Sequence, residues 1–340
     1  MTSVALRARP GWKAVVAGIA AVLVTGTVGL ALGPVRIPWS GVAKAVADAL
    51  PLLEIDHGLT SVEQRILFDI RLPRVVLGAL VGSVLAMTGA AYQGVFRNAL
   101  ADPYLLGVAA GGGLGATVAL ASGADQHLVV LYALIGALLA VVATYALGRS
   151  VGGRSITSLV LAGVAVGAFL TAVQTFLLQR RLETLREVYS WILGRLSTVG
   201  WGEVALLSPY FVVAGLVLLA SGRLLDVMSV GDEEARSLGV DVDRVRLIVV
   251  VAATLATAAA VSVSGLIGFV GIIVPHAVRL TLGWSYRVIV PMAILFGAAF
   301  LMAADVIART AVAPAELPIG VVTAFIGAPF FVVVLRTASR

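Results

Sequence analysis

The sequence contains no cysteine and few charged residues, and each shortage excludes a class of protein. Without cysteine the chain can form no disulfide framework, no thiolate metal site and no cysteine nucleophile. Charged residues make up 12% of the 340 residues and hydrophobic residues 60%, whereas about a quarter of a soluble domain is charged. Too little polar surface remains to coat a water-soluble globule of this length. The composition therefore predicts a membrane protein and excludes a soluble enzyme.

Lysine and histidine are also scarce, which bears on phosphate and metal chemistry. Lys13 and Lys44 are the only lysines, and neither stands in a GxxxxGK[ST] sequence, so the chain has no phosphate-binding loop of its own. The three histidines lie far apart without an HExxH-like spacing, so no metal site is predicted. The formal charge of +6 does not indicate nucleic-acid binding, because the arginines are scattered singly between apolar runs.

Long apolar runs make up most of the sequence. A membrane-spanning helix needs about 20 mostly apolar residues. A marginal run, Leu266–Leu282, is interrupted by Pro275, His276 and Arg279, but Gly265 separates it from the run before, so it is counted as a tenth span. The other nine are Ala14–Leu32, Val75–Val95, Tyr104–Ser122, Leu128–Leu147, Ile156–Leu178, Val204–Ala220, Leu247–Ser264, Val288–Ala308 and Ile319–Leu335. Ten spans place both termini on one side, and a slight arginine excess in the loops of that side predicts cytoplasmic termini.

Small residues recur at a spacing that favours close helix packing in lipid. Glycines stand four residues apart in four pairs, and this spacing lets helix backbones approach one another. The pairs are Gly78 and Gly82, Gly107 and Gly111, Gly111 and Gly115, and Gly163 and Gly167. The sequence thus predicts an all-α polytopic bundle of about ten transmembrane helices, folded as one domain over residues 1–340.

The predicted spans contain few side chains that could bind an ion or catalyse a reaction. Asp305 and Arg279 are the only Asp, Glu, Lys or Arg residues within them, and the helix centres offer hydroxyls and amides such as Gln93, Thr171 and Gln174. An ion-coupled carrier normally buries carboxylates or interrupted helices at the midplane, so ion coupling is disfavoured. No paired carboxylates or Ser/His/Asp grouping indicates a membrane enzyme.

The most informative soluble segment is residues 222–246, predicted to be cytoplasmic. Ser229 and Asp232 have the spacing of a capping box, the acidic run from Asp232 suits the positive end of a helix dipole, and Gly239 suits a helix stop. Ala235 and Leu238 would then form a small apolar face between charged flanks. This pattern predicts a short helix, either solvated or docked on another protein.

Four segments in order resemble the iron-chelate and cobalamin uptake permeases, the membrane subunits of type II ABC importers. The first is RLPRVVLGALVGSVLAMTGAAYQGVFRNALADPYLLGVAAGGGLGA, from Arg71 to Ala116. The others are SLVLAGVAVG from Ser158, VGDEEARSLGV leading to SGLIGFVGIIVPHAVRL, and ADVIARTAVAPAELPIGVVTAFIGAPFF from Ala304. Ala99 departs from the family, which often has proline there. The resemblance covers most of the chain from Arg71 onward and implies a bundle like that of a cobalamin-importer permease.

The resemblance also implies partners. Two permease copies work with two cytoplasmic ATPase subunits, which bind ATP and magnesium, and an extracytoplasmic binding protein delivers the substrate. No cofactor is expected on this chain itself, and its surroundings are the lipid bilayer of a bacterial inner membrane. In the family the binding protein presents acidic residues to permease arginines, and Arg71, Arg74 and Arg309 occupy the matching positions. Their alternative role is that of arginines anchored at the membrane interface.

Further residues take roles from the resemblance. The coupling helix that docks on the ATPase corresponds to Gly231–Gly239, with Glu234, Ala235, Leu238 and Gly239 as its principal residues. The fifth span would line the channel, with Ile156 and Thr157 near the cytoplasmic gate and Thr171 and Gln174 along it. A structural role is expected for Gln93, Arg97, Asn98, Pro103, Pro275 and His276, the last as a helix-end hydrogen-bonding residue.

The sequence thus favours a non-enzymatic permease subunit, working as a homodimer in an ATP-driven importer. An iron chelate, either a siderophore or haem, is preferred as substrate, with cobalamin as the alternative. Two other functions stay open, an ion-coupled secondary transporter working alone and a membrane scaffold that transports nothing.

Overall fold

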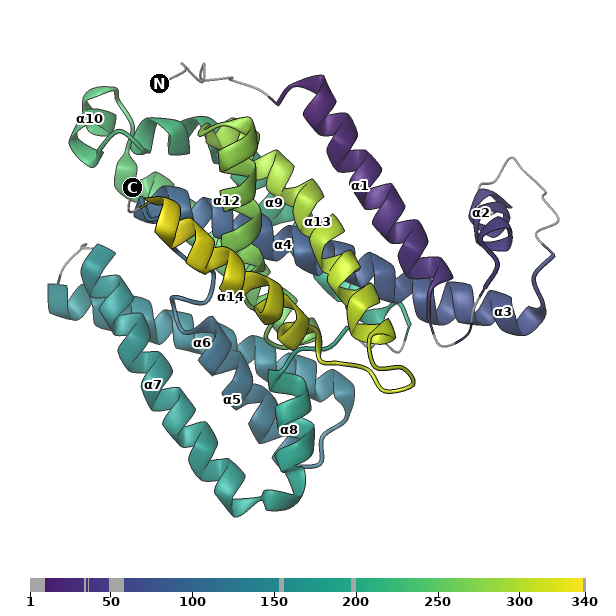
Figure 1. Cartoon of the computed structure of the whole chain (residues 1–340). Coiled ribbons are helices and arrows are strands. Elements are labelled where there is room, and N and C mark those ends of the chain that lie inside the picture. Colours follow the sequence, from purple (N-terminus) through teal and green to yellow (C-terminus); the bar gives the residue numbers. More distant parts are fainter. Residues whose placement is uncertain are drawn as a thin grey trace.

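The computed structural model describes residues 10–33, 35, 37–48, 58–152, 156–196 and 200–338, and within these ranges the chain is helical without strands (Figure 1). Ten helices correspond one to one to the predicted spans: α1 (Trp12–Ala31), α4 (Leu72–Phe96), α5 (Val108–Ala121), α6 (Gln126–Gly152), α7 (Ile156–Arg180), α9 (Gly202–Met228), α11 (Val242–Ser264), α12 (Val270–Leu282), α13 (Tyr286–Thr310) and α14 (Ile319–Ala338). Short elements join them: α2 (Trp39–Asp48), α3 (Ser61–Arg65), the π-helix η1 (Ile66–Arg71), the 3₁₀-helix η2 (Leu182–Thr184), α8 (Leu185–Ile192) and α10 (Asp232–Ser237). The predicted all-α class is confirmed.

The helices differ in length more than the sequence indicates. Seven are long and apolar enough to cross a membrane, whereas α5, α12 and the apolar part of α14 are shorter. Helices α5 and α12 both begin about one turn later than predicted. The residue before each helix has a positive φ, +81° at Gly107 and +70° at Phe269, and this left-handed conformation ends helical hydrogen bonding toward the N-terminus.

The core is built around α4, α11 and α13, which are buried for most of their length. Glycines allow α4 to approach α13 and α12 closely, because a Cβ atom on Gly82 would collide with the main chain at Gly297 of α13, and one on Gly89 with the main chain at Gly271 of α12. Gly111, Gly115 and Gly163 face neighbouring backbones in the same way, which confirms the predicted contacts. The other three glycines of the predicted pairs, Gly78, Gly107 and Gly167, do not face a backbone, since a Cβ there would meet only side chains, and at Gly167 only that of Ala110, at 4.0 Å.

Hydroxyl groups join two of these core helices inside the bundle. The Tyr92 and Thr254 hydroxyls lie 2.6 Å apart, and the Thr257 hydroxyl donates to that of Thr88 at 3.2 Å. All four side chains are buried. Polar contacts of this kind fix the register of α4 against α11, where apolar packing alone would tolerate sliding.

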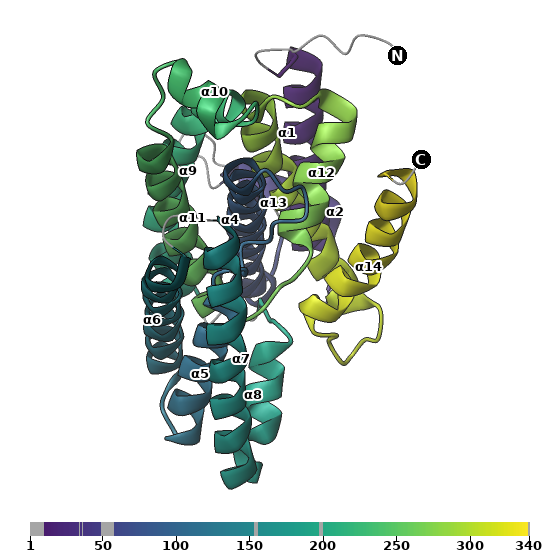
Figure 2. The ribbon, with the colours of Figure 1, turned by 90° about the vertical axis from the view of Figure 1, so that its left-hand side faces the viewer.

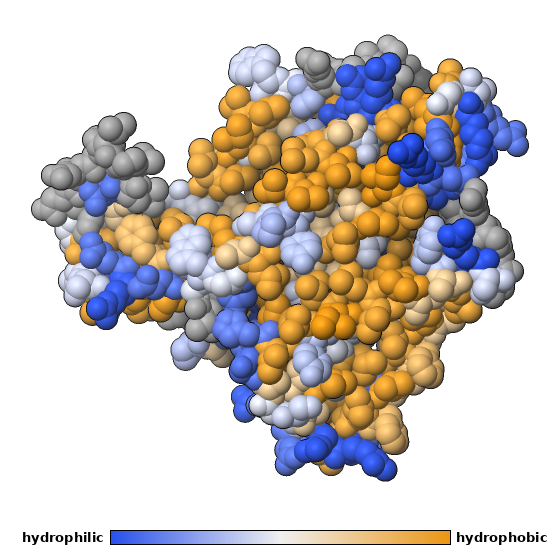
Figure 3. Space-filling model, turned by 180° about the vertical axis from the view of Figure 1, so that it is seen from behind, coloured by the Kyte–Doolittle hydropathy of each residue, from blue (hydrophilic) through white to orange (hydrophobic). Residues whose placement is uncertain are grey.

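The bundle has two polar ends with an apolar belt between them. The start of α1, the end of α14 and α10 lie at one end, here called the α10 side, and α8 lies at the other, the α8 side (Figures 1 and 2). Hydrophobic residues cover the middle of the rear face, and hydrophilic residues gather above and below it (Figure 3). This is the surface of a multi-pass membrane protein.

Candidate functional site

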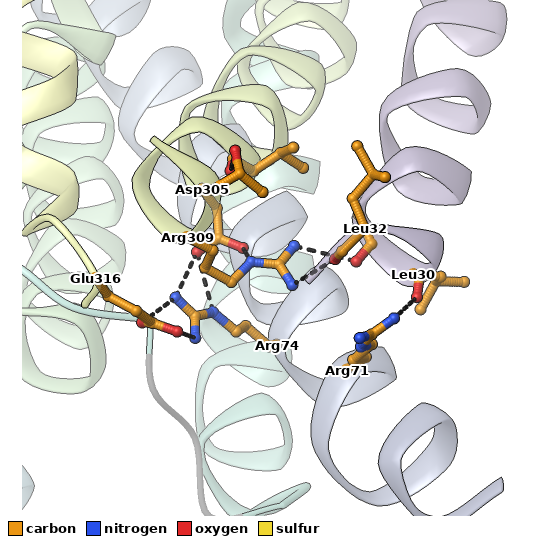
Figure 4. Close-up of polar contacts among 10 residues, drawn as sticks. Leu30, Leu32, Arg71, Arg74, Asp305, Arg309 and Glu316 are labelled. Carbon is orange, nitrogen blue, oxygen red and sulfur yellow. Dashed lines mark hydrogen bonds and ion pairs between the residues drawn. The ribbon is translucent and has the colours of Figure 1, made fainter. Parts of the chain in front are cut away.

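Two of the three predicted arginines, Arg74 and Arg309, meet carboxylates on the α8 side. The Arg74 guanidinium lies between Asp305 of α13, with Nε to Oδ1 at 3.0 Å, and Glu316 of the α13–α14 loop (Figure 4). Its two terminal nitrogens donate to the two Glu316 oxygens at 3.0 and 2.9 Å, a bidentate pair. Asp305 also pairs with Arg309, with Oδ2 to Nε at 2.9 Å. One buried aspartate thus joins two arginines from different helices.

Arg71 and Arg309 reach the end of α1. Arg71 donates to the carbonyl oxygens of Leu30 and Ala31 at 2.7 and 3.0 Å and also to that of Val35. Arg309 donates to the carbonyls of Gly29 and Leu32 (Figure 4). The last carbonyls of a helix lack helical donors and carry partial negative charge, so two guanidinium groups satisfy and stabilise them.

This geometry bears on the predicted docking role of the arginines. Arg71 and Arg309 are each only 4% exposed, so their donors are directed to the chain itself. The Arg74 side chain is 13% exposed. Contact of any of the three with a docked protein stays a prediction, and Arg74 is the most accessible of them.

On the α10 side, residues 231–239 form the predicted short helix. Helix α10 starts at Asp232 and has Asp232, Glu233 and Glu234 in its first turn, as the sequence predicts. Gly239 has φ +84°, and the N–H groups of Gly239 and Val240 donate to the carbonyls of Arg236 and Ala235. These two bonds form a Schellman motif, so Gly239 ends the helix as expected.

Two details of this segment correct the prediction. Ser229 does not cap the N-terminus of α10, because its hydroxyl donates back to the Asp226 carbonyl at 2.6 Å and Gly231 is the N-cap residue. Ala235 does not face a partner either, since it is fully buried against Met228 and Val242. Leu238 remains on the surface, 69% exposed, and so does Val230 on the other flank of the helix.

Asp232 fastens α10 to the bundle. Its carboxylate pairs with Arg246 of α11 at 2.9 Å and with Arg97, the residue that ends α4, at 3.3 Å. Partial burial alone would raise the pKa of Asp232, but the Arg246 hydrogen bond and the charges of Arg246, Arg97 and Arg236 lower it below its usual value. The carboxylate is therefore ionised at neutral pH and joins α10 to two core helices.

A groove of about 600 Å³ runs along α7. Small α7 residues such as Gly163 and Gly167 form one wall, Tyr189 of α8 lies at one end, and Asp102 and Tyr104 of the α4–α5 loop also line it. Thr171 and Gln174 line the groove as well, and buried Gln174 donates to the Thr117 hydroxyl of α5 at 2.9 Å. The predicted channel residues Thr171 and Gln174 thus share one cavity.

The two predicted gate residues stand at the start of α7. Thr157 is exposed, and the side chain of Ile156 lies outside the described residues. Most of the α7 surface is uncovered in the single chain, with Leu161, Val164 and Phe169 each more than 60% exposed. This apolar face has room for lipid or for another protein.

The other predicted structural residues mostly join helices. The turn after α4 is closed by the Asn98 N–H, which donates to the Gln93 carbonyl at 3.2 Å, and by the Asn98 side chain, which accepts from the Leu100 N–H at 2.9 Å. A Cβ atom on Gly271 would lie 2.7 Å from Pro103, so this proline packs the turn against α12. His276 packs edge-on against Phe330, with 6.1 Å between the ring centroids. It has no hydrogen bond within the described part of the chain, so its predicted role as a helix-end hydrogen-bonding residue is wrong.

Sequence reasoning missed residues that act over long separations. Glu316 pairs with Arg74, which lies 242 positions earlier in the chain. Tyr104 was not singled out, although its hydroxyl donates to the Ile267 carbonyl at 3.0 Å and accepts from the Ile267 N–H at 3.1 Å. It thereby satisfies the irregular backbone between α11 and α12. No local pattern marks such pairs.

Comparison with known proteins gives one consistent result. The model of the FecCD transport family matches residues 21–337. A cobalamin import system permease protein of Halobacterium salinarum is 44% identical over 304 residues, covering 88% of this chain and 80% of the relative. An Fe(3+)-citrate import system permease protein of Bacillus subtilis is 37% identical and covers 86% and 87%, and a hemin transport system permease protein of Yersinia pestis is 37% identical and covers 80% and 84%.

A solved structure has the same architecture. It is described as a metal-chelate type ABC transporter in an inward-facing conformation, is 28% identical and superposes with a TM-score of 0.83. The alignment covers 96% of this chain and 99% of the other. The likeness extends over the whole bundle.

Proposed function

Because the chain belongs to the FecCD transport family, we propose that it is the membrane permease of an ATP-driven importer for a metal chelate. Two copies would enclose the translocation channel, two cytoplasmic ATPase subunits would bind α10, and a substrate-binding protein would dock on the α8 side. The α10 side would then face the cytoplasm. The observation that carries the proposal is the family match over nearly the whole chain.

The geometry of α10 supports the proposed docking of the ATPase subunits on this helix. The helix is short, ends in a Schellman motif and projects from the bundle with Val230 and Leu238 exposed on either flank. Exposed apolar residues at the tip of an anchored helix suit a protein cleft better than water. The Asp232 pairs would carry a displacement of the docked helix to α4 and α11.

The lining of the groove along α7 suits a bulky substrate that is bound only weakly. Its walls are largely small or apolar, and among the described residues that line it Asp102 is the only one with a carboxylate or a basic group. A pathway of this kind lets a large solute pass without binding it tightly. The uncovered face of α7 would close the channel against a second copy, which supports a homodimer.

Two substrate classes follow from the relatives. The 44% identity to a relative named for cobalamin favours cobalamin, whereas the 37% identities to relatives named for ferric citrate and hemin favour iron chelates. The substrate class we propose is a metal chelate, with cobalamin now placed before iron chelates.

Reconstituted transport tests the proposal. The chain, its ATPase and its binding protein would be placed in liposomes, and uptake of cobalamin, haem and ferric siderophore would be measured. The expected result is uptake that needs ATP at the α10 side and binding protein at the α8 side and is insensitive to ionophores. Uptake driven by an ion gradient without ATP would support a secondary carrier instead, and a chain that binds cytoplasmic protein but moves nothing would support a scaffold.

A further inference from the structure

Asp102 is the one charged side chain that lines the groove along α7, within the described part of the chain. It belongs to the α4–α5 loop, and its Oδ1 accepts a hydrogen bond from the Tyr104 N–H at 2.8 Å. No arginine, lysine or histidine of the described residues lines the groove, and Asp102 has no ion pair among them. The groove therefore contains a carboxylate that no cation balances.

The Asp102 carboxyl is ionised at neutral pH. Burial raises its pKa to about 6, against the opposing effect of the hydrogen bond from the Tyr104 main chain. A carboxyl with this pKa carries its charge at pH 7 and above. The titratable groups that interact with it are the phenols of Tyr92 and Tyr104, which are uncharged in this pH range. Asp102 thus places a fixed negative charge in a largely apolar groove.

The other polar groups available in the groove are neutral. The hydroxyls of Thr171 and Tyr189 have no hydrogen bond within the described residues. The Tyr104 hydroxyl, by contrast, is already bonded to Ile267 both as donor and as acceptor. An amide of a passing solute can therefore donate to Asp102 and accept from a free hydroxyl, whereas a carboxylate meets a like charge. Repulsion between like charges is strong in a groove of low dielectric constant.

We propose that Asp102 makes the groove selective for uncharged chelates with amide groups at their periphery and against chelates with free carboxylates. Cobalamin belongs to the favoured class, whereas haem, with its propionates, and ferric citrate belong to the disfavoured class. Asp102 is then a specificity-determining residue of the permease itself. The inference rests on the proposed function, which makes the groove the channel. A second copy would add a second carboxylate and strengthen the selection.

A pair of matched substrates isolates the effect of charge. In cobalamin monocarboxylate one peripheral amide is hydrolysed, so the molecule differs from cobalamin by one negative charge and hardly in size. Both are supplied on saturating binding protein to liposomes that contain the permease–ATPase complex and ATP, and initial uptake rates are compared. The natural chain should take up the monocarboxylate roughly tenfold more slowly than cobalamin.

Asp102→Asn should raise the ratio of monocarboxylate to cobalamin uptake roughly tenfold, because it removes the charge but keeps an oxygen for the Tyr104 N–H. Asp102→Glu should keep the ratio low. Glu183→Gln is the matched control, because Glu183 is exposed on η2 and does not line the groove. It removes the same charge and should change the ratio less than twofold. Thr171→Lys adds a cation to the same groove and should raise the ratio, so it decides the matter if Asp102→Asn fails to assemble.

The outcomes separate the inference from the proposed function. An unchanged ratio in Asp102→Asn, or an equal rise in Glu183→Gln, would overturn the selection by charge. Uptake of haem or ferric citrate by the natural chain without uptake of cobalamin would overturn it as well and would leave the proposed importer intact. Absence of ATP-driven uptake of cobalamin, haem and ferric siderophores alike would instead refute the proposed function.

Discussion

Gln93 of α4 donates its side-chain amide to the carbonyl oxygen of Gly271 in α12 at 3.1 Å. Pro275 stands four residues after Gly271 and has no N–H, so it leaves this carbonyl without its helical donor. Gln93 replaces the missing bond from another helix, and its own oxygen accepts from Arg279 at 3.1 Å. One buried amide thus satisfies the carbonyl that Pro275 leaves without a donor.

Replacing Gln93 should therefore destabilise the bundle. Gln93→Leu leaves the Gly271 carbonyl and one Arg279 donor unsatisfied in a buried place, which costs about 1–3 kcal/mol for each such group. Thermal unfolding of the detergent-solubilised chain would measure the loss as a lower midpoint. Gln179→Leu is the control, because Gln179 is exposed on α7. Equal midpoints of the two variants would contradict the bridging role.

The contacts of the neighbouring arginines Arg71 and Arg74 should differ in how much they stabilise the fold. Arg71→Gln leaves carbonyls at the end of α1 without donors and should lower the unfolding midpoint clearly. Glu316→Gln breaks the exposed pair of Arg74. It should lower the free energy of unfolding by only about 0–1 kcal/mol and so shift the midpoint little. Protease cleavage near residue 32 would report the freed end of α1. A stable Arg71→Gln chain with weak docking would mean that Arg71 contacts the partner directly.

Gly239→Val should uncouple ATP hydrolysis from transport. The φ of +84° costs a β-branched residue about 1–2 kcal/mol or more, so the end of α10 would rearrange. Nothing lies within 4 Å of a Cβ built at this position, so crowding does not explain an effect. The ratio of ATP hydrolysed to substrate moved is the measurement, and Gly239→Asn, which tolerates the left-handed conformation, should retain more coupling. Normal coupling in the valine variant would argue against a role for this helix end.

Asp232→Asn should loosen α10 without unfolding the bundle. The amide keeps the size of the side chain but loses the charge that Arg246 and Arg97 share. Hydrogen exchange of the amides in residues 232–240 should become faster, while that of α4 and α11 stays unchanged. Asp243→Asn, which alters longer and more exposed pairs with Arg236 at 3.6 Å and Arg246 at 3.7 Å, is the comparison and should have a smaller effect. Slower or unchanged exchange in Asp232→Asn would exclude the anchor.

Sequence reasoning recovered the features that depend on neighbouring residues. Spans follow from apolar length, and the stop at Gly239 from the conformational freedom of glycine. It placed Ala235 on the wrong face, because the orientation of a helix of six residues is decided by what packs against it. It could not anticipate the pair of Arg74 in α4 and Glu316 in the α13–α14 loop, because their contact exists only after the bundle forms. Burial of Arg71 escaped it for the same reason.

Several polar side chains in the bundle are bonded to main-chain oxygens: Arg71 to the end of α1, Gln93 to α12 and Thr144 to the α4–α5 loop at Leu106. They maintain the scaffold, whereas groove-lining residues of α7 such as Val164, Gly167 and Ala168 have no polar side chain and take no part in these bonds. Substitutions at these three positions leave the scaffold bonds intact. With the groove as the proposed channel, a change of substrate would then need only a few substitutions along α7 and no change in the bonds that hold the bundle together.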